Sequence, residues 1–266
     1  MNRILIQFFA FVGVFLAIWL SLAQIPFLKK SELENFAKDN EKRLGDLILK
    51  TIKQTEEEIK SMEIKSRIDS IIQRVCKDND IDPAKIKAHI IRNSEVNAFA
   101  LPDNNMVIYS GLIDYAKSAE EVAGVVAHEI GHMEKNHVMK KLLKEVGLAM
   151  LFTMAGGDAS FEIMKETARL LSSSAFDRDQ EREADQFATE AMAKASIDPE
   201  HLANFLFRVS KTVDLPEAFD WVNTHPNGGD RASDILDQRK KLKYETKPIL
   251  NTSWDDVKKN LVEEDE

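Results

Sequence analysis

The chain has 266 residues, of which 44% are hydrophobic and 30% are charged, so it is long enough for one sizeable folded core with appendages. Its net charge is -9 and the sequence contains no basic cluster, which argues against a nucleic-acid partner. The single cysteine, Cys76, cannot form an internal disulfide and excludes a metal site built from several cysteines.

The first predicted element is a membrane-targeting segment. No charged residue occurs from Ile4 to Leu28, and a helix of that length covers about 37 Å, enough to cross a hydrocarbon core of roughly 30 Å. We favour an uncleaved single-pass anchor, because the apolar stretch is longer than is typical of a signal peptide. The alternative is a cleaved signal peptide with residues 21–23 as its cleavage site. Residues 1–28 are therefore expected to be a membrane anchor or signal segment.

The chain then changes from helical to extended periodicity. Residues 29–65 carry apolar side chains at helical spacing and are expected to form a helical linker. Short runs rich in apolar, β-branched and aromatic residues next predict strands, at 89–91, 96–101 and 106–109. The turn-forming residues 102–105 separate the last two strands. We therefore expect a small antiparallel β-sheet in this part of the chain.

The last of these strands is a candidate for substrate binding. An edge strand can pair with the backbone of an extended peptide, which all protein substrates share. A purely structural hairpin explains the same pattern equally well, and both interpretations remain open. On the first interpretation, the residues that contact the substrate are Met106, Val107, Ile108 and Tyr109.

The stretch His-Glu-Ile-Gly-His at residues 128–132 is the central motif. Ser118, with a glutamate three residues later, is a typical helix start, and apolar residues follow at helical spacing, so the motif is predicted to lie on a helix. Residues four apart on a helix point to the same side, so His128 and His132 can bind one zinc ion. Glu129 lies at the edge of that face, where it can act as a general base on a water beside the metal.

The same helix is expected to continue through His137. That residue would lie about 140° round the helix axis from His132, so we assign it a structural or supporting role rather than ligation. Gly124 and Gly131, inside the helix, each cost roughly 1 kcal/mol relative to alanine. Their presence predicts close packing by a neighbouring element.

A catalytic zinc site needs a third protein ligand and one open position. The residues shortly after His132 offer no ligand at the spacings that compact zinc proteases use, so a later helix must supply it. The best candidate is Glu181, which shares a helix face with Asp185 four residues later. Glu181 would bind the metal, and Asp185 would accept a hydrogen bond from the outer nitrogen of a ligand histidine. Glu183 points elsewhere and is expected to be solvent-exposed.

A loop further along the chain carries two more candidate catalytic residues. Pro226 favours an extended backbone at His225, and the glycines at 228–229 allow the chain to turn before the next helix. His225 could stabilise the oxyanion of a tetrahedral intermediate. Arg231 could hold His225 in place or share that work.

Together, these motifs resemble the gluzincin family that includes the CAAX prenyl endopeptidases, the HtpX-type membrane proteases and the mitochondrial Oma-type proteases. The resemblance covers roughly residues 60–245. The motifs that carry it are, in chain order, Asn97–Pro102, His128–His132, Glu181 with Asp185, and Thr224–Pro226 with Arg231. With one predicted span and no room for a C-terminal helical-repeat domain, the chain looks closest to the small, single-anchored bacterial members.

The resemblance implies a zincin-like catalytic domain, at residues 66–245, that binds one zinc ion per chain. Its implied ligands are His128, His132 and Glu181, and its implied base is Glu129. The aspartate one turn after Glu181 would orient a ligand, and the histidine and arginine of the later loop would face the cleft. In some members the histidine of this loop occupies the open position of the metal and keeps the enzyme inactive.

We therefore expect an α+β, predominantly α-helical protein that ends in an acidic tail at 246–266. The expected function is that of a membrane-associated zinc-dependent endopeptidase acting on misfolded or membrane-associated proteins in protein quality control. Its expected location is the bacterial cell membrane with the catalytic domain in the periplasm, or the periplasm itself if the N-terminal segment is cleaved. The alternative is a non-catalytic, membrane-tethered holdase whose structural metal has His225 as a permanent fourth ligand. The sequence leaves the oligomeric state open.

Overall fold

The structure of the protein is a computed structural model that describes residues 30–211, 221 and 224–263. The chain divides into two units, 1–40 and 41–266, and the candidate site lies entirely within the second. The predicted membrane segment falls outside the described residues. Among the helices that are described, none combines the length and the apolar composition needed to cross a bilayer.

The described chain is mostly helical with one small sheet, as predicted. The helices are α2 (Lys30–Thr55), α3 (Met62–Lys77), α4 (Ser110–Tyr115), α5 (Ala119–Glu134), α6 (His137–Glu145), α7 (Leu148–Gly156), α8 (Phe161–Ser173), α9 (Arg178–Lys194), α10 (Glu200–Lys211), α12 (Gly228–Arg239) and α13 (Trp254–Glu263). A short 3-10 helix and three strands lie between α3 and α4, namely η1 (Pro83–Lys85), β1 (Lys87–Ile91), β2 (Ala98–Leu101) and β3 (Asn105–Tyr109).

The sheet precedes α5 and has the strand order β1-β3-β2. β2 and β3 form the predicted antiparallel hairpin, and the turn between them contains Asp103 and Asn104, both with positive φ. β1 pairs with β3 in parallel, on the side of β3 opposite to β2. The sheet is therefore mixed rather than wholly antiparallel.

The central position of β3 removes the basis of the predicted substrate contact. Residues 106–109 all pair with β1 on one side, and on the other side the first three pair with β2 while the N–H of Tyr109 donates to the carbonyl of Asn97; all four are buried. A strand whose two edges are already paired cannot add a peptide, so the expectation that residues 106–109 form an edge strand is wrong, and their assignment to substrate binding loses the reason given for it. The strand that contacts α5 is β2, which lies at an edge of the sheet.

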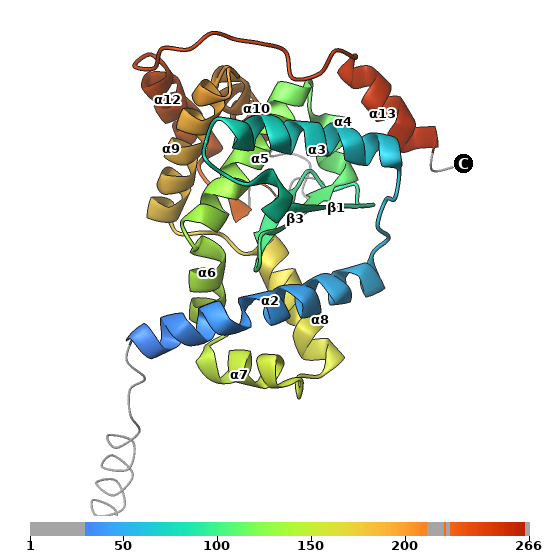
Figure 1. The fold of residues 1–266 in the computed structure, drawn as a ribbon, viewed down its shortest axis with the longest axis vertical. Coiled ribbons are helices and arrows are strands. Elements are labelled where there is room, and N and C mark those ends of the chain that lie inside the picture. Colours follow the sequence, from blue (N-terminus) through green and yellow to red (C-terminus); the bar gives the residue numbers. More distant parts are fainter. Residues whose placement is uncertain (1–29, 212–220, 222–223, 264–266) are drawn as a thin grey trace, which may run out of the picture. The chain divides into compact units, whose positions relative to one another are not determined.

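Helix α5 is the central helix of this unit and contacts β2, α3, α9 and α10 (Figure 1). It begins as predicted, since the hydroxyl of Ser118 accepts a hydrogen bond from a backbone N–H of its first turn. Its two inner glycines lie where neighbouring helices approach closely. A Cβ atom at Gly124 would lie 2.8 Å from Cβ of Leu202 in α10, and one at Gly131 would lie 3.1 Å from Cα of Ala184 in α9. The glycines thus let α9 and α10 pack directly on α5, which carries the motif His128–His132 and is called the metal-motif helix below.

The substitution Gly124→Ala is expected to destabilise the protein by about 1–3 kcal/mol, as over-packing of a filled core does. The added methyl would overlap the Leu202 backbone region of α10, and this outweighs the roughly 1 kcal/mol gain in helix propensity. Gly156→Ala in α7 is the matched control, because its Cβ would meet no atom closer than 3.4 Å. Urea unfolding of both variants measures the difference. Wild-type stability of Gly124→Ala would mean that α10 is not tightly packed here.

The metal-motif helix does not continue through His137 as predicted. α5 ends at Glu134, and α6 begins at His137 after a break at Asn136. Asn136 adopts a left-handed conformation with φ 55° and ψ 32°, which asparagine tolerates better than most residues. Its N–H donates to the carbonyl of Met133 at 2.9 Å and closes the last turn of α5. The break changes the chain direction, so the 140° offset expected on a continuous helix does not apply.

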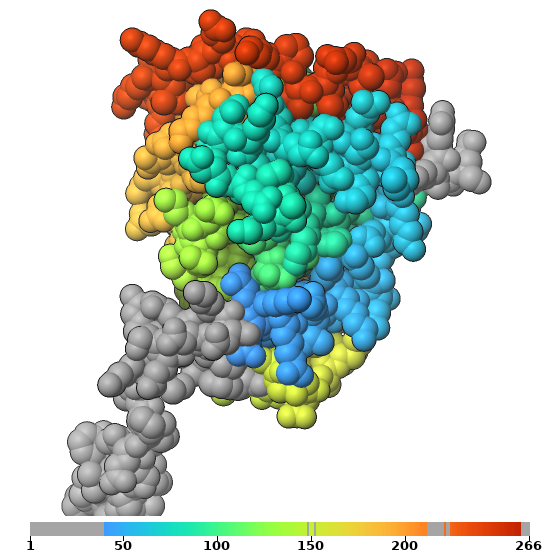
Figure 2. Space-filling view, viewed as in Figure 1, coloured from blue at the N-terminus to red at the C-terminus, as the bar shows by residue number. Residues whose placement is uncertain are grey.

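The segment predicted as an acidic tail contains a packed helix. α13 contacts α3 and α4, and the red C-terminal part of the chain lies along the surface beside α3 (Figures 1 and 2). Trp254 is buried together with Val257, one turn later, and its indole N–H donates to the carbonyl of Ile113 at 3.2 Å. Burial of this apolar stripe, not the acidic character of the segment, decides where it lies.

Candidate metal centre

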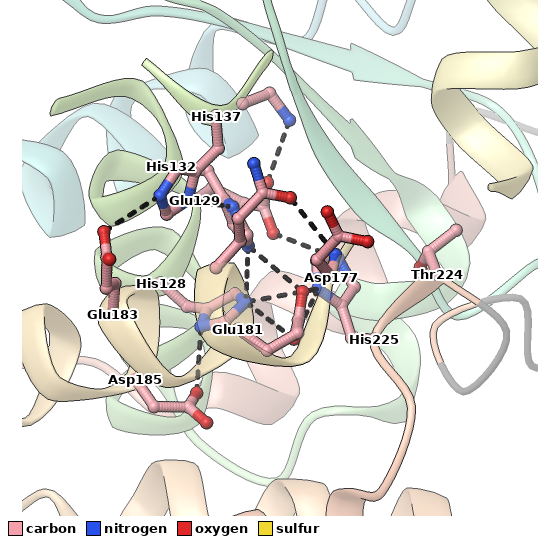
Figure 3. A network of polar contacts seen from close by, with 12 residues as sticks. His128, Glu129, His132, His137, Asp177, Glu181, Glu183, Asp185, Thr224 and His225 are labelled. Atoms are coloured by element: carbon pink, nitrogen blue, oxygen red, sulfur yellow. Dashed lines mark hydrogen bonds and ion pairs between the residues drawn. The ribbon is translucent and has the colours of Figure 1, made fainter. Parts of the chain in front are cut away.

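The three side chains predicted as metal ligands converge in the core (Figure 3). His128 and His132 on α5 are fully buried, and their Nε2 atoms lie 3.0 Å apart. Glu181 reaches them from α9, with carboxylate oxygens 3.6 Å from Nε2 of His128 and 3.4 Å from Nε2 of His132. The contact between α5 and α9 at Gly131 brings this distant carboxylate to the paired imidazoles.

A fourth side chain, His225, lies within the same group. Its Nδ1 atom is 2.9 Å from Oε1 of Glu181 and 3.2 Å from Nε2 of His128. His128, His132, Glu181 and His225 each offer one possible ligand atom, and these four atoms all lie within 4.8 Å of one another. His225 was predicted to face the cleft, and the structure places it directly among the candidate ligands.

The arrangement of partners around the two helical histidines fits a bound cation. Oδ1 of Asp185 lies 3.0 Å from Nδ1 of His128, and Nδ1 of His137 lies 3.0 Å from Nδ1 of His132. If each ligand ring donates its N–H outward, its Nε2 carries a lone pair. Two such lone pairs 3.0 Å apart repel each other unless a cation lies between them. Imidazole nitrogens and a carboxylate are a donor set that zinc accepts, so these residues fit a zinc ion.

Arg231 of α12 forms ion pairs with both Asp185 and Glu181 of α9. Its Nε and Nη2 atoms donate to the two carboxylate oxygens of Asp185 at 2.6 and 2.7 Å, and its Nη1 lies 2.6 Å from Oε2 of Glu181. Nη1 also donates to the carbonyl oxygen of His225 at 3.2 Å. Arg231 thus ties the loop that carries His225 to the two acids of α9.

The charge of Arg231 keeps these buried acids ionised. Burial alone would raise the pKa of Asp185, but the guanidinium brings it down to about 2. Burial also opposes ionisation of Glu181, yet His225 and Arg231 together hold its pKa well below the usual value. Both carboxylates are therefore anionic near neutral pH, and an anionic carboxylate is the form that binds a metal.

Glu129 is fully buried beside the candidate ligands. Its Oε2 accepts a hydrogen bond from the N–H of Ala100 in β2 at 2.9 Å. Its Oε1 lies 3.5 Å from Nε2 of His225 and has no hydrogen-bond partner among the described residues. Burial, and next the negative charge of Glu181, raise the pKa of Glu129 well above its ordinary value. A carboxyl group of this kind can both take up and release a proton.

Aromatic rings enclose the histidines. Phe176 stacks on His132 with 3.9 Å between ring centroids, and Trp221 stacks on His225 with 4.0 Å. Burial lowers the pKa of His132 well below its usual value and that of His225 to about 4, so both rings are neutral. The Nζ of Lys141 lies 4.2 Å from the centroid of Phe176 and donates to two backbone carbonyls at the end of α8. Burial lowers the pKa of that lysine to about 8.

Sequence reasoning missed several of the residues that surround the candidate ligands. Phe176, Trp221 and Lys141 lie outside every motif, and no local pattern connects them to the histidines. Ala100 was placed in a strand, but its hydrogen bond to Glu129 depends on how the sheet packs on α5. These contacts join segments far apart in the sequence, and the periodicity of apolar residues predicts only local structure.

Comparison with known proteins identifies similar chains. A profile of peptidase family M48 matches residues 63–239. The beta-barrel assembly-enhancing protease of Yersinia pestis is 24% identical over 220 residues, which cover 77% of this chain and 45% of that protein. The mitochondrial metalloendopeptidase OMA1 of Arabidopsis thaliana is 29% identical over 143 residues, covering 54% and 29%. The metalloprotease LoiP of Escherichia coli is 28% identical over 166 residues, covering 60% and 65%. The chain thus spans less than half the length of the first two relatives.

Proposed function

Because this chain belongs to peptidase family M48, we propose that it is a zinc-dependent endopeptidase that hydrolyses peptide bonds of misfolded or membrane-associated proteins. The observation that carries the proposal is the convergence of His128, His132 and Glu181 around one point, with the carboxylate of Glu129 beside them. This pattern provides both a place for a metal and a proton-transferring group next to it.

The proposed chemistry divides between the ligands and the base. His128, His132 and Glu181 would hold one zinc ion, which when bound supplies a Lewis acid that activates water and polarises the scissile carbonyl. Glu129 would take a proton from the attacking water and return it to the leaving amine. The Ala100 N–H holds Oε2 of Glu129 in place and leaves Oε1 available for the proton.

We propose β2 in place of β3 as the strand that binds the substrate backbone. The carbonyl of Asn97 accepts from the N–H of Tyr109 at 3.0 Å, so alternation along an antiparallel pair directs the backbone groups of Ala98 and Ala100 away from β3. The N–H of Ala100 already points at Glu129. An extended peptide added along this edge would run past the catalytic base.

We propose different roles for the two residues of the later loop. Arg231 is engaged by Asp185 and Glu181, so its role would be to hold the loop and the ligands rather than to contact substrate. The neutral ring of His225 has its one N–H on Nδ1, which donates to the Glu181 carboxylate at 2.9 Å, and this N–H could stabilise an oxyanion once the loop moves aside.

The position of His225 also supports a second candidate function. A structural zinc site closes its fourth position with a protein ligand, and His225 lies within the four-residue group that could do so. In that case the protein would be a non-catalytic, membrane-tethered holdase. Glu129 favours the endopeptidase, because its Oε1 has no hydrogen-bond partner among the described residues, its pKa is raised by burial, and a purely structural site has no use for a buried base.

The relatives and the N-terminal sequence support the proposed setting. The Yersinia pestis relative is named for enhancing beta-barrel assembly, and the Escherichia coli relative is named a metalloprotease. We propose a role in protein quality control at the bacterial cell membrane, with residues 4–28 as a single-pass anchor and the catalytic domain in the periplasm. Cleavage after the N-terminal segment would instead release the protein into the periplasm.

We expect the purified full-length chain to cleave casein, to lose this activity after treatment with 1,10-phenanthroline, and to regain it when one equivalent of zinc is added. Metal removal takes away the Lewis acid while Glu129 and the fold remain. Gel analysis of casein, with zinc measured on the same samples, checks the result. A chain that prevents aggregation of a heated client protein and cleaves nothing, with or without zinc, would instead support the holdase.

A further inference from the structure

We infer that His137 and Glu183 form a relay that fixes which nitrogen of His132 carries the proton and so holds this ring as a metal ligand. The relay presupposes the zinc site proposed above. Both would be positioning residues, because neither lies among the four candidate ligands and they act through His132.

The relay is a line of three side chains that runs from the site to the surface (Figure 3). Nδ1 of His132 lies 3.0 Å from Nδ1 of His137, and Nε2 of His137 lies 3.3 Å from Oε2 of Glu183. The side chain of His137 is 1% exposed, whereas that of Glu183 is 56% exposed. A carboxylate in contact with water is thus connected to a fully buried ligand through one imidazole.

For neutral rings, the chemistry of imidazole sets the direction of these hydrogen bonds. A neutral ring has one N–H and one lone pair, and a carboxylate such as Glu183 can only accept. Nε2 of His137 must therefore donate to Glu183, which leaves a lone pair on Nδ1 of His137. That lone pair accepts the N–H from Nδ1 of His132, and Nε2 of His132 then carries the lone pair that faces the metal position. The opposite arrangement would place a proton on Nε2 of His132 and prevent ligation.

The left-handed break at Asn136 makes this contact possible. On a continuous helix His137 would lie about 140° round the axis from His132 and could not reach its outer nitrogen. With the break, His137 opens α6 and turns its ring toward His132, with 5.1 Å between the ring centroids. The local conformation that ends the metal-motif helix therefore also brings the relay residue into position.

The other helical ligand is oriented differently. His128 contacts the carboxylate of Asp185 directly, and that carboxylate is shared with Arg231. His132 instead meets a neutral ring, with the carboxylate of Glu183 one step further out. Helix α9 supplies the ligand Glu181 and both outer carboxylates within two turns, so one helix sets the orientation of both histidines.

The variants His137→Phe and His137→Asn test the relay. Phenylalanine keeps an aromatic ring but removes the acceptor, so we expect zinc affinity to fall by about 10- to 100-fold, as is usual when an outer partner of a ligand is lost. Asparagine places a carbonyl oxygen close to the former Nδ1 position, so its affinity should stay within a few-fold of wild type. Competition with a chromophoric chelator measures zinc affinity, and thermal melting of the zinc-free proteins shows whether both variants are folded.

A second pair of variants lies at the surface and does not depend on core packing. Glu183→Ala is expected to weaken zinc binding several-fold, whereas Glu190→Ala, which removes an exposed carboxylate from the same helix, should leave it unchanged. Nitrogen-15 NMR of the zinc-free wild type should show the His132 proton on Nδ1, and Glu183→Ala should redistribute it between the two nitrogens.

The relay would be overturned if His137→Phe bound zinc as tightly as wild type, or if His137→Asn lost as much affinity as His137→Phe. The second result would mean that ring volume, not the acceptor, is what matters. A wild-type chain that binds no zinc in this assay would contradict the proposed zinc site itself, which is a separate outcome.

Discussion

Replacing Glu129 by glutamine is expected to abolish peptide cleavage while zinc remains bound. Glutamine has nearly the same volume and its side-chain oxygen can still accept the hydrogen bond from the Ala100 N–H, so the packing between β2 and α5 is preserved. The amide cannot take up a proton, and loss of a general base lowers rates by roughly 10²- to 10⁴-fold. The cleavage rate of casein and the zinc content per chain, measured on the same preparation, check both halves of this prediction.

Glu134→Gln is the matched control for this substitution. Glu134 also lies on α5, but it is exposed at the end of the helix and outside the candidate site. Its replacement removes the same charge from the same helix and should leave cleavage unchanged. If Glu129→Gln still cleaved casein at the wild-type rate, Glu129 would have no place in the mechanism, and a different base would have to be found.

Replacing Glu181 by alanine is expected to remove zinc and cleavage together. The substitution deletes the one candidate ligand that α9 contributes and leaves two α5 histidines and His225 around the site. Zinc affinity should fall by more than the roughly 10- to 100-fold that follows the loss of an outer partner, because a direct ligand is lost. Zinc per chain after dialysis and the cleavage rate are the two measurements.

The controls must separate loss of the ligand from loss of the fold. Glu181 also neutralises the buried Arg231, and breaking a buried ion pair can cost about 3–5 kcal/mol. Glu181→Gln keeps the side-chain volume and a carbonyl oxygen, so it should remain folded and still bind zinc weakly. Glu190→Ala, on the exposed face of α9, should behave like wild type. A folded Glu181→Ala chain with normal zinc content would place the third ligand elsewhere.

Much of the candidate site was accessible from local sequence patterns. The spacing of His128 and His132 places both rings on one face of a helix, and Ser118 marks where that helix begins. Glu181 and Asp185 were paired by the same four-residue spacing, and their carboxylates indeed reach the two histidines. Local spacing could place these side chains because helical geometry depends on neighbours within one or two turns.

The wrong predictions share a physical origin. The strand pattern at 106–109 was recognised, yet its central place in the sheet depends on where β1 and β2 pair. From helical spacing alone, the metal-motif helix was predicted to continue past Asn136, but the left-handed conformation of this one residue ends it. Strand order is set by pairing between distant segments, and a single backbone conformation is set by small differences in free energy that neighbouring contacts can reverse.

By itself, the sequence determined the class of chemistry, because the types and the spacing of His128, Glu129 and His132 permit few functions other than metal binding with an adjacent base. Only the tertiary structure decided that His225 lies among the candidate ligands, that β2 lies beside Glu129, and that His137 meets the outer nitrogen of His132. The reason is that the spacing of His128, Glu129 and His132 is set within a little more than one turn of a single helix, whereas the fourth position and the supporting contacts arise from packing between segments that lie far apart in the sequence.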